Sequence, residues 1–369
     1  MSRKLITIST IMTLMSTSVI ADVPNVAADI APIHSLVSRV MDGVGAPKLI
    51  VQSGASPHGY RLRPSEAKAL QDADHVFWMG EELTPWLDSA IGTLASKASV
   101  TTLLDQQGVI LHDFREGALF EAHDHSAHGD DDHDDHDDHD DHDDHKDHDD
   151  HDDHDDHDDH KDHDDHDDHD DHDDHKDHDD HDDHDDHKDH DDHDDHDDHG
   201  SHDPHAWLSP ENAKLWLNII ASKLSVSDPE NAATYFMNAA AGQAEIEAMI
   251  AEVKATLKPV QGGKFVVFHD AYQYFENDFD FYASGAISLG DSSDPSPARI
   301  EKVQKRIRDE GIQCVLAEPQ FKKGLVATVM EGSDATASVI DPLGAELETG
   351  PKLYTRLIKN MAKTLRNCL

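Results

Sequence analysis

The feature that most constrains this chain is a run of 70 residues, 130–199, made of aspartate, histidine and lysine alone. This Asp/His tract holds 43 Asp, 23 His and 4 Lys, mostly as a repeated Asp-Asp-His unit, and carries a formal charge of −39. A period of three matches neither a helix nor a strand, neighbouring carboxylates repel, and no apolar side chain is present to bury. We therefore expect a disordered insert, reaching with its flanks from about residue 123 to 202.

The other 299 residues read as ordinary globular sequence, with a net charge of −10 out of the total of −49. Their number is typical of two domains. Because no basic patch offsets the acidity, we expect no nucleic-acid partner, and we expect the protein to be a monomer.

The N-terminus resembles an export signal. Arg3 and Lys4 precede a mostly apolar run, residues 5–20, that carries no charge and leads to Ala21. This pattern predicts a signal peptide over residues 1–21 that is cleaved near Ala21. The alternative is a transmembrane anchor, for which 16 residues with interspersed Ser and Thr are short. No cysteine lies near the cleavage position, so we expect a soluble periplasmic protein without a lipid anchor.

The chain has two cysteines, Cys314 and Cys368. In an oxidising compartment they can form a disulfide, and the alternative is two separate thiols. The export signal favours the disulfide. Metal ligation by the two thiols is less favoured, because no further cysteine supports it.

Short apolar runs rich in β-forming residues recur on both sides of the tract. They cover residues 49–51, 75–79, 265–268, 314–317 and 338–340. Runs of this length and composition are typical of strands buried on both faces of a parallel sheet. Helical patterns starting at Pro64 and near Pro297 lie between them. The alternation predicts an α/β protein with two lobes, each a mostly parallel sheet flanked by helices.

A different pattern fills residues 228–258. An Asp-Pro-Glu start is followed by strong helix formers without an internal proline, which predicts one helix of roughly 40 Å. Such a helix suits a rigid link between an N-terminal lobe, residues 22–227, and a C-terminal lobe, residues 259–369. The alternative is two shorter helices that break near Gly242.

Imidazole and carboxylate groups are ligands for borderline divalent ions, Zn²⁺ above all. The tract therefore favours metal capture at many weak sites, because a flexible chain loses entropy when it wraps an ion. The alternative is a solvated polyanion that keeps the protein soluble. Aspartate alone would serve that purpose, so the regular histidines favour metal binding.

Four side chains outside the tract occupy positions suited to a rigid metal site, namely His58, His205, His269 and Asp341. Three of them follow a predicted strand, and ligands of open α/β sheets bind at the carboxyl ends of strands. His205 comes directly after the tract. A single histidine is more often a packing or capping residue, and so we interpret His34 and His75; His112 fits either role.

Signals for catalysis are weak. The sequence has no His-Glu-x-x-His, no Gly-x-Ser-x-Gly and no glycine-rich phosphate loop. A zinc hydrolase would need an open metal position and a general base. Asp270 and Glu318 are conceivable bases, but nothing specific selects them, and we expect a protein that is not an enzyme.

Several segments resemble one family, the zinc-specific periplasmic solute-binding proteins of ABC importers (the high-affinity zinc uptake, ZnuA-like group). The matching segments span nearly the whole mature chain in order: residues 54–58, 62–65, 74–80, 82–87, 203–210, 268–275, 317–321 and 341–344. In this family the His-rich insert also sits just before the segment with the second histidine. One departure is Pro57, since some members have an acidic residue directly before the first histidine.

The resemblance implies two lobes joined by one long helix, with the metal between them. It carries over His58, His205 and His269 as ligands, with Asp341 or water as the fourth, and the Pro57 departure favours Asp341. It also implies a Cys314–Cys368 disulfide. Three imidazoles favour Zn²⁺ over the harder Mn²⁺.

The function that this resemblance implies is capture of Zn²⁺ in the periplasm and delivery to the membrane permease of an ABC importer. The Asp/His tract would act as a low-affinity collector. Two alternatives of other classes are a periplasmic zinc buffer or metallochaperone without an importer role, and a zinc hydrolase.

Deleting residues 130–199 separates the two kinds of metal site. In a zinc titration we expect one tight equivalent to survive, because the rigid ligands lie outside the tract, while the weak equivalents disappear. Loss of the tight equivalent would refute the rigid site.

Overall fold

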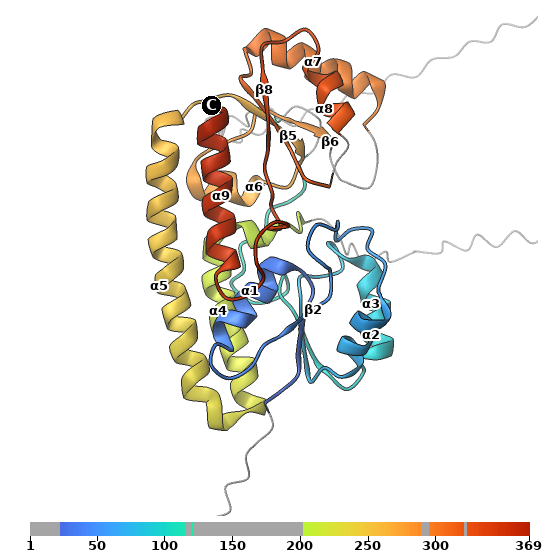
Figure 1. Ribbon diagram of the computed structural model, residues 1–369, viewed down its shortest axis with the longest axis vertical. Helices are drawn as coiled ribbons and strands as arrows, with labels where there is room; N and C mark the ends of the chain where they lie inside the picture. Colours follow the sequence, from blue (N-terminus) through green and yellow to red (C-terminus); the bar gives the residue numbers. More distant parts are fainter. Residues whose placement is uncertain (1–22, 116–119, 121–201, 289–294, 321–322) are drawn as a thin grey trace, which may run out of the picture. The chain divides into compact units, whose positions relative to one another are not determined.

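The computed structural model describes residues 23–115, 120, 202–288, 295–320 and 323–369. The predicted signal peptide and the Asp/His tract both lie outside these residues. The described chain contains two four-stranded parallel sheets with helices packed on them (Figure 1). The expectation of an α/β protein with two mostly parallel sheets is therefore confirmed.

The N-terminal sheet has the strand order β2-β1-β3-β4. Its strands are β1 (Val26–Ala28), β2 (Lys48–Leu49), β3 (His75–Trp78) and β4 (Ser99–Thr102). The helices of this half are α1 (Ala31–Val40), α2 (Pro64–Gln71) and α3 (Pro85–Leu94). Strand β2 is shorter than the predicted run 49–51, although the backbone N–H groups of Ile50 and Val51 still donate to the carbonyls of Ala28 and Asp29.

The C-terminal sheet repeats this arrangement, with the order β6-β5-β7-β8. Its strands are β5 (Phe265–His269), β6 (Ala286–Ser288), β7 (Cys314–Ala317) and β8 (Thr336–Val339). Its helices are α6 (Gln273–Phe279), α7 (Pro297–Glu310), α8 (Lys323–Met330) and α9 (Leu353–Cys368). In both sheets the first strand of the sheet in the chain, β1 or β5, has neighbours on both sides, and ligands of such open sheets bind at the carboxyl ends of the strands.

Helices α4 (Pro210–Ser227) and α5 (Ala232–Leu257) follow the N-terminal sheet in the chain. Helix α5 is continuous through Gly242, so one long helix is confirmed and a break there is wrong. A side chain at Gly242 would meet Leu217 of α4, its Cβ lying 2.9 Å from Cδ1, so the glycine allows α4 and α5 to pack closely. Helix α5 packs against both α4 and α9, which lie along the same side of it (Figure 1).

One hydrophobic core connects the two halves. It contains buried residues of both sheets, such as Val26 of β1 and Phe265 of β5, and of the helices α1, α4, α5 and α9. The lobe boundaries at residues 227 and 258 stay a prediction. Among the helices that the structure describes, none has the length and apolar character that a membrane crossing requires.

The chain segments on the two sides of the insert are paired with each other. Asp113 and His202 form an isolated antiparallel bridge, and His202 Nδ1 lies 2.9 Å from Asp113 Oδ1. The backbone N–H of Asp203 donates to the carbonyl of His112 at 2.8 Å. The segments before and after the tract are therefore joined.

The predicted disulfide is present. Cys314 opens β7 and Cys368 ends α9, their Cα atoms are 5.6 Å apart, and their sulfur atoms are bonded. The bond fastens the last helix to the strand beside β5, and it closes a loop with a sequence separation of 54 residues.

We expect Cys368→Ser to lower the free energy of unfolding by about 4 kcal/mol, the entropy that a loop of this length removes from the unfolded chain. Denaturant titration measures the loss. Treating the wild-type protein with a reductant should reproduce it, and an unchanged midpoint in the reductant would contradict the prediction.

Candidate metal centre

Three histidines from distant parts of the chain converge. One ligand nitrogen each of His58, His205 and His269 lies within 4.8 Å of the other two. His58 is in the loop between β2 and α2, His205 precedes the short 3-10 turn Ala206–Leu208, and His269 is the last residue of β5. The structure thus brings together three of the four side chains that the sequence singles out.

His205 and His269 form the buried part of this cluster, with 5% and 3% of their surface exposed. Their Nε2 atoms face one another at 3.3 Å. Each Nδ1 atom lies 2.6 Å from a carboxylate oxygen, that of Asp203 for His205 and that of Glu318 for His269. If Nδ1 carries the proton and donates it to the carboxylate, both Nε2 lone pairs point into the same space, where a cation can accept them.

The two carboxylates are themselves buried, each with 2% of its surface exposed. A buried carboxylate needs hydrogen-bond partners, because it has lost its water. Asp203 Oδ1 also accepts the backbone N–H of His205 at 3.0 Å, and Glu318 Oε2 accepts Gln320 Nε2 at 2.7 Å. Both imidazoles are therefore held in one orientation by groups that are fixed in turn.

His58 is half-buried, and its ring centroid lies 5.6 Å from that of His205. It is the most exposed of the three imidazoles. An ion bound by all three would thus have two ligands in the interior and one on a surface loop.

Asp341 follows β8, as predicted, but it is not a member of the three-histidine group. Its Oδ1 accepts the backbone N–H groups of Leu343 at 3.0 Å and Gly344 at 2.8 Å, and its Oδ2 that of Ala345 at 2.5 Å. Burial raises the pKa of this carboxyl group, and these hydrogen bonds oppose the rise. In this geometry Asp341 holds the loop after β8, and its role as the fourth ligand stays a prediction.

An ion-pair network lies beside the centre. Arg115, from the segment that leads into the insert, contacts Asp270, which follows His269, and binds Glu276 of α6 at 2.6 Å. Burial raises the pKa of Asp270, and it raises that of Glu276 to about 7, while the arginine opposes both shifts. The guanidinium group compensates two buried carboxyls that would otherwise be costly.

Other histidines have packing roles or lie outside the cluster. His34 Nε2 lies 3.2 Å from the carbonyl of Pro47, and His75 Nε2 lies 2.7 Å from Ser227 Oγ. Burial lowers the pKa of both, in agreement with a structural role. The ring of His112 packs on Tyr274 at 4.6 Å.

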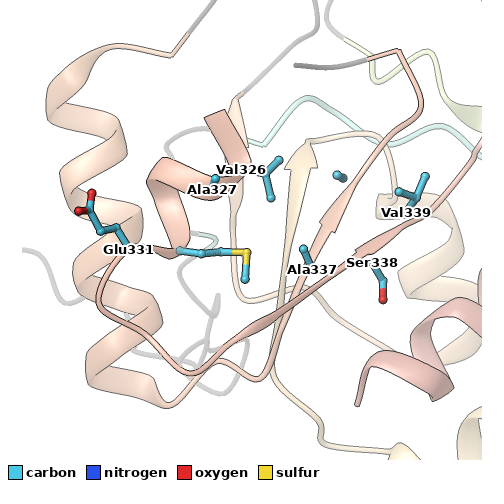
Figure 2. A pocket seen from close by; sticks show the side chains of 8 residues that line it. Val326, Ala327, Glu331, Ala337, Ser338 and Val339 are labelled. Carbon is cyan, nitrogen blue, oxygen red and sulfur yellow. The ribbon is translucent and has the colours of Figure 1, made fainter. Parts of the chain in front are cut away.

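A cavity of about 550 Å³ lies elsewhere, between α8 and the strands β7 and β8 (Figure 2). Its lining is mostly apolar, with Val326, Ala327, Met330 and Val339, and the one charged side chain is Glu331. Among the described residues none of the imidazoles lines it, and it is separate from the three-histidine group.

Sequence reasoning did not assign the partners of the imidazoles. Asp203 stands two residues before His205, a spacing that allows contact between their side chains. Glu318 follows β7, the neighbour of β5 in the sheet, so that it meets His269 at the carboxyl edge. Knowledge of the strand order would therefore have indicated the contact between Glu318 and His269. No sequence pattern around Arg115 indicates its ion pairs with Asp270 and Glu276.

Two parallel α/β sheets, with His58 and His269 at the carboxyl ends of strands and His205 converging on them, form a site suited to a divalent metal ion such as Zn²⁺. A family model described as "ZnuA: Zinc-uptake complex component A periplasmic" matches residues 26–368. The chain belongs to this family.

Individual relatives agree with this assignment. A "High-affinity zinc uptake system protein ZnuA" from Brucella abortus is 45% identical over 344 residues, which is 93% of this chain and 91% of that protein. A protein of the same name from Paracoccus denitrificans is 41% identical over 350 residues, covering 95% and 93%. A crystal structure of ZnuA has the same fold, with a TM-score of 0.63, 18% identity, and coverage of 94% of this chain and 99% of that chain.

We expect Glu318→Gln to raise the dissociation constant for Zn²⁺ by about 10- to 100-fold, the usual loss when an outer partner of a ligating histidine is changed. The amide still accepts a hydrogen bond but no longer supplies the negative charge. Competition with a chromophoric zinc chelator measures the constant. Glu331→Gln, which removes a carboxylate that lines the cavity beside α8 and is not in the three-histidine group, is the matched control, and equal constants for both variants would contradict the role of Glu318.

Proposed function

We propose that this protein captures Zn²⁺ in the periplasm with His58, His205 and His269 and delivers it to the permease of an ABC importer. The observation that carries the proposal is the approach of three imidazole nitrogens to within 4.8 Å of one another. Membership of the zinc-uptake family supports the cargo and the compartment.

The donor set supports zinc as the ion. Zn²⁺ accepts four ligands in a tetrahedron and binds imidazole readily, whereas Mn²⁺ favours oxygen ligands. Three imidazoles leave one position, for which Asp341 and water are the candidates. The relatives from Brucella abortus and Paracoccus denitrificans are both named for high-affinity zinc uptake.

The arrangement of the three histidines also supports a protein that first captures zinc and later releases it. His205 and His269 are held by Asp203 and Glu318, so little ordering is needed when the ion arrives. The half-buried His58 then completes the site from the surface. Zinc can leave by the same side once that ligand moves away.

The Asp/His tract acts in this proposal as a low-affinity collector of zinc. Its imidazoles are largely neutral near pH 7 and free to bind, and protonation competes below about pH 6. Loading of the tract should fade there.

Catalysis is not part of the proposed function. The two carboxylates that could serve as general bases are already engaged, Asp270 with Arg115 and Glu318 with His269 and Gln320. The proposal further includes a monomer that binds no nucleic acid and is released by cleavage near Ala21.

We expect His58→Ala and His269→Ala each to raise the dissociation constant of the tight zinc site by at least about 100-fold, because each removes a direct ligand. Isothermal titration on protein without residues 130–199 isolates that site. His112→Ala is the control, since it removes an imidazole that packs on Tyr274 outside the cluster. Asp341→Asn tests the fourth ligand, and an unchanged constant would leave water in that position.

A role in import separates this proposal from a zinc buffer. Cells that lack the protein should fail to grow in a zinc chelator, and the wild-type chain should restore growth while His269→Ala should not. Normal growth of the deletion strain would favour the buffer.

A further inference from the structure

The loop that carries His58 is held by two aromatic side chains outside the metal centre. We call residues 50–63, between β2 and α2, the His58 loop. Trp86 Nε1 donates a hydrogen bond to the carbonyl of Pro57 at 2.7 Å. The Tyr60 hydroxyl donates to Glu66 Oε1 at 2.8 Å, and the rings of Tyr60 and Trp86 are 5.8 Å apart.

His58 is placed by a loop, whereas His269 ends a central strand. The loop follows β2, a two-residue strand at the edge of its sheet. The position of the loop therefore contributes to the distance between His58 and the His205–His269 pair.

The bond from Trp86 acts at the residue before His58. The carbonyl of Pro57 belongs to the peptide group that joins Pro57 to His58. The proline ring limits its own φ to about −65°, and the indole N–H holds the carbonyl in one direction. Together they fix the orientation of the peptide group that joins Pro57 to His58.

The bond from Tyr60 acts on the other side of His58. Glu66 is buried, with 4% of its surface exposed, and its second oxygen accepts the backbone N–H of Arg63 at 2.7 Å. Tyr60 is thereby tied to the start of α2. Leu62 and Trp86 pack against the apolar cluster that α2 and α3 form with one face of the sheet. Glu66, the partner of Tyr60, is in α2, and Trp86 is in α3, so both hydrogen bonds connect the His58 loop to this pair of helices.

We propose that Trp86 and Tyr60 are positioning residues for zinc, because they hold the His58 loop where the third imidazole can join the His205–His269 pair. This inference rests on the proposed function, which makes His58 a zinc ligand. A looser loop leaves the buried pair intact but lets His58 leave the ion more often, so zinc should dissociate faster and bind more weakly.

Trp86→Phe tests the inference, because it keeps an aromatic ring and removes the N–H donor. Trp216→Phe is the matched control, since the indole of Trp216 on α4 also donates to a backbone carbonyl, that of Leu103, at 3.1 Å. We expect Trp86→Phe to raise the zinc dissociation constant and the dissociation rate by about two- to tenfold, the worth of one hydrogen bond. Trp216→Phe should lower the melting temperature and leave both zinc constants unchanged. Tyr60→Phe should act in the same direction as Trp86→Phe.

A double-mutant cycle with His58→Ala distinguishes positioning from general stability. If Trp86 acts through His58, then Trp86→Phe has no further effect on zinc binding once His58 is alanine. An equal effect in both backgrounds, or none in the wild-type background, would overturn the inference. If His58→Ala itself leaves zinc binding unchanged, it is the ligand assignment of the proposed function that has failed.

Discussion

Two hydrogen bonds between a buried imidazole and a buried carboxylate hold the metal centre together. Asp203 and Glu318 are buried, and each lies 2.6 Å from the Nδ1 atom of an imidazole, that of His205 and that of His269, which can donate to it. The same bonds turn the two Nε2 atoms toward one another. The same hydrogen bonds therefore stabilise the buried carboxylates and orient the imidazole ligands for a cation.

The fold supplies this arrangement by repeating one strand order. In each half the first strand is central, and loops leave its carboxyl end beside those of its neighbours. His269 and Glu318 meet because β5 and β7 are paired in parallel. The shared core, with α5 and α9 packed together and the disulfide at the end of α9, keeps the two sheets in one compact unit.

Sequence alone predicts much of this molecule, and the remainder has a physical reason. Apolar runs predict the sheets because burial on both faces leaves a clear pattern, and the position of His269 after such a run predicts its place at the sheet edge. The contacts of Glu318 with His269 and of Arg115 with Asp270 join residues 49 and 155 positions apart. No local sequence pattern predicts such contacts unless the order of the strands in the sheet is known. Asp341 follows its predicted strand, yet its oxygens accept backbone N–H groups, a use that composition does not distinguish from metal ligation.

The bridge between Asp113 and His202 joins the segments on the two sides of the insert. For a flexible loop, each doubling of length adds only about 0.6 kcal/mol of closure entropy. A change in the number of Asp-Asp-His units would therefore alter the zinc-binding capacity of the chain while adding little to the entropy cost of folding the rest of it.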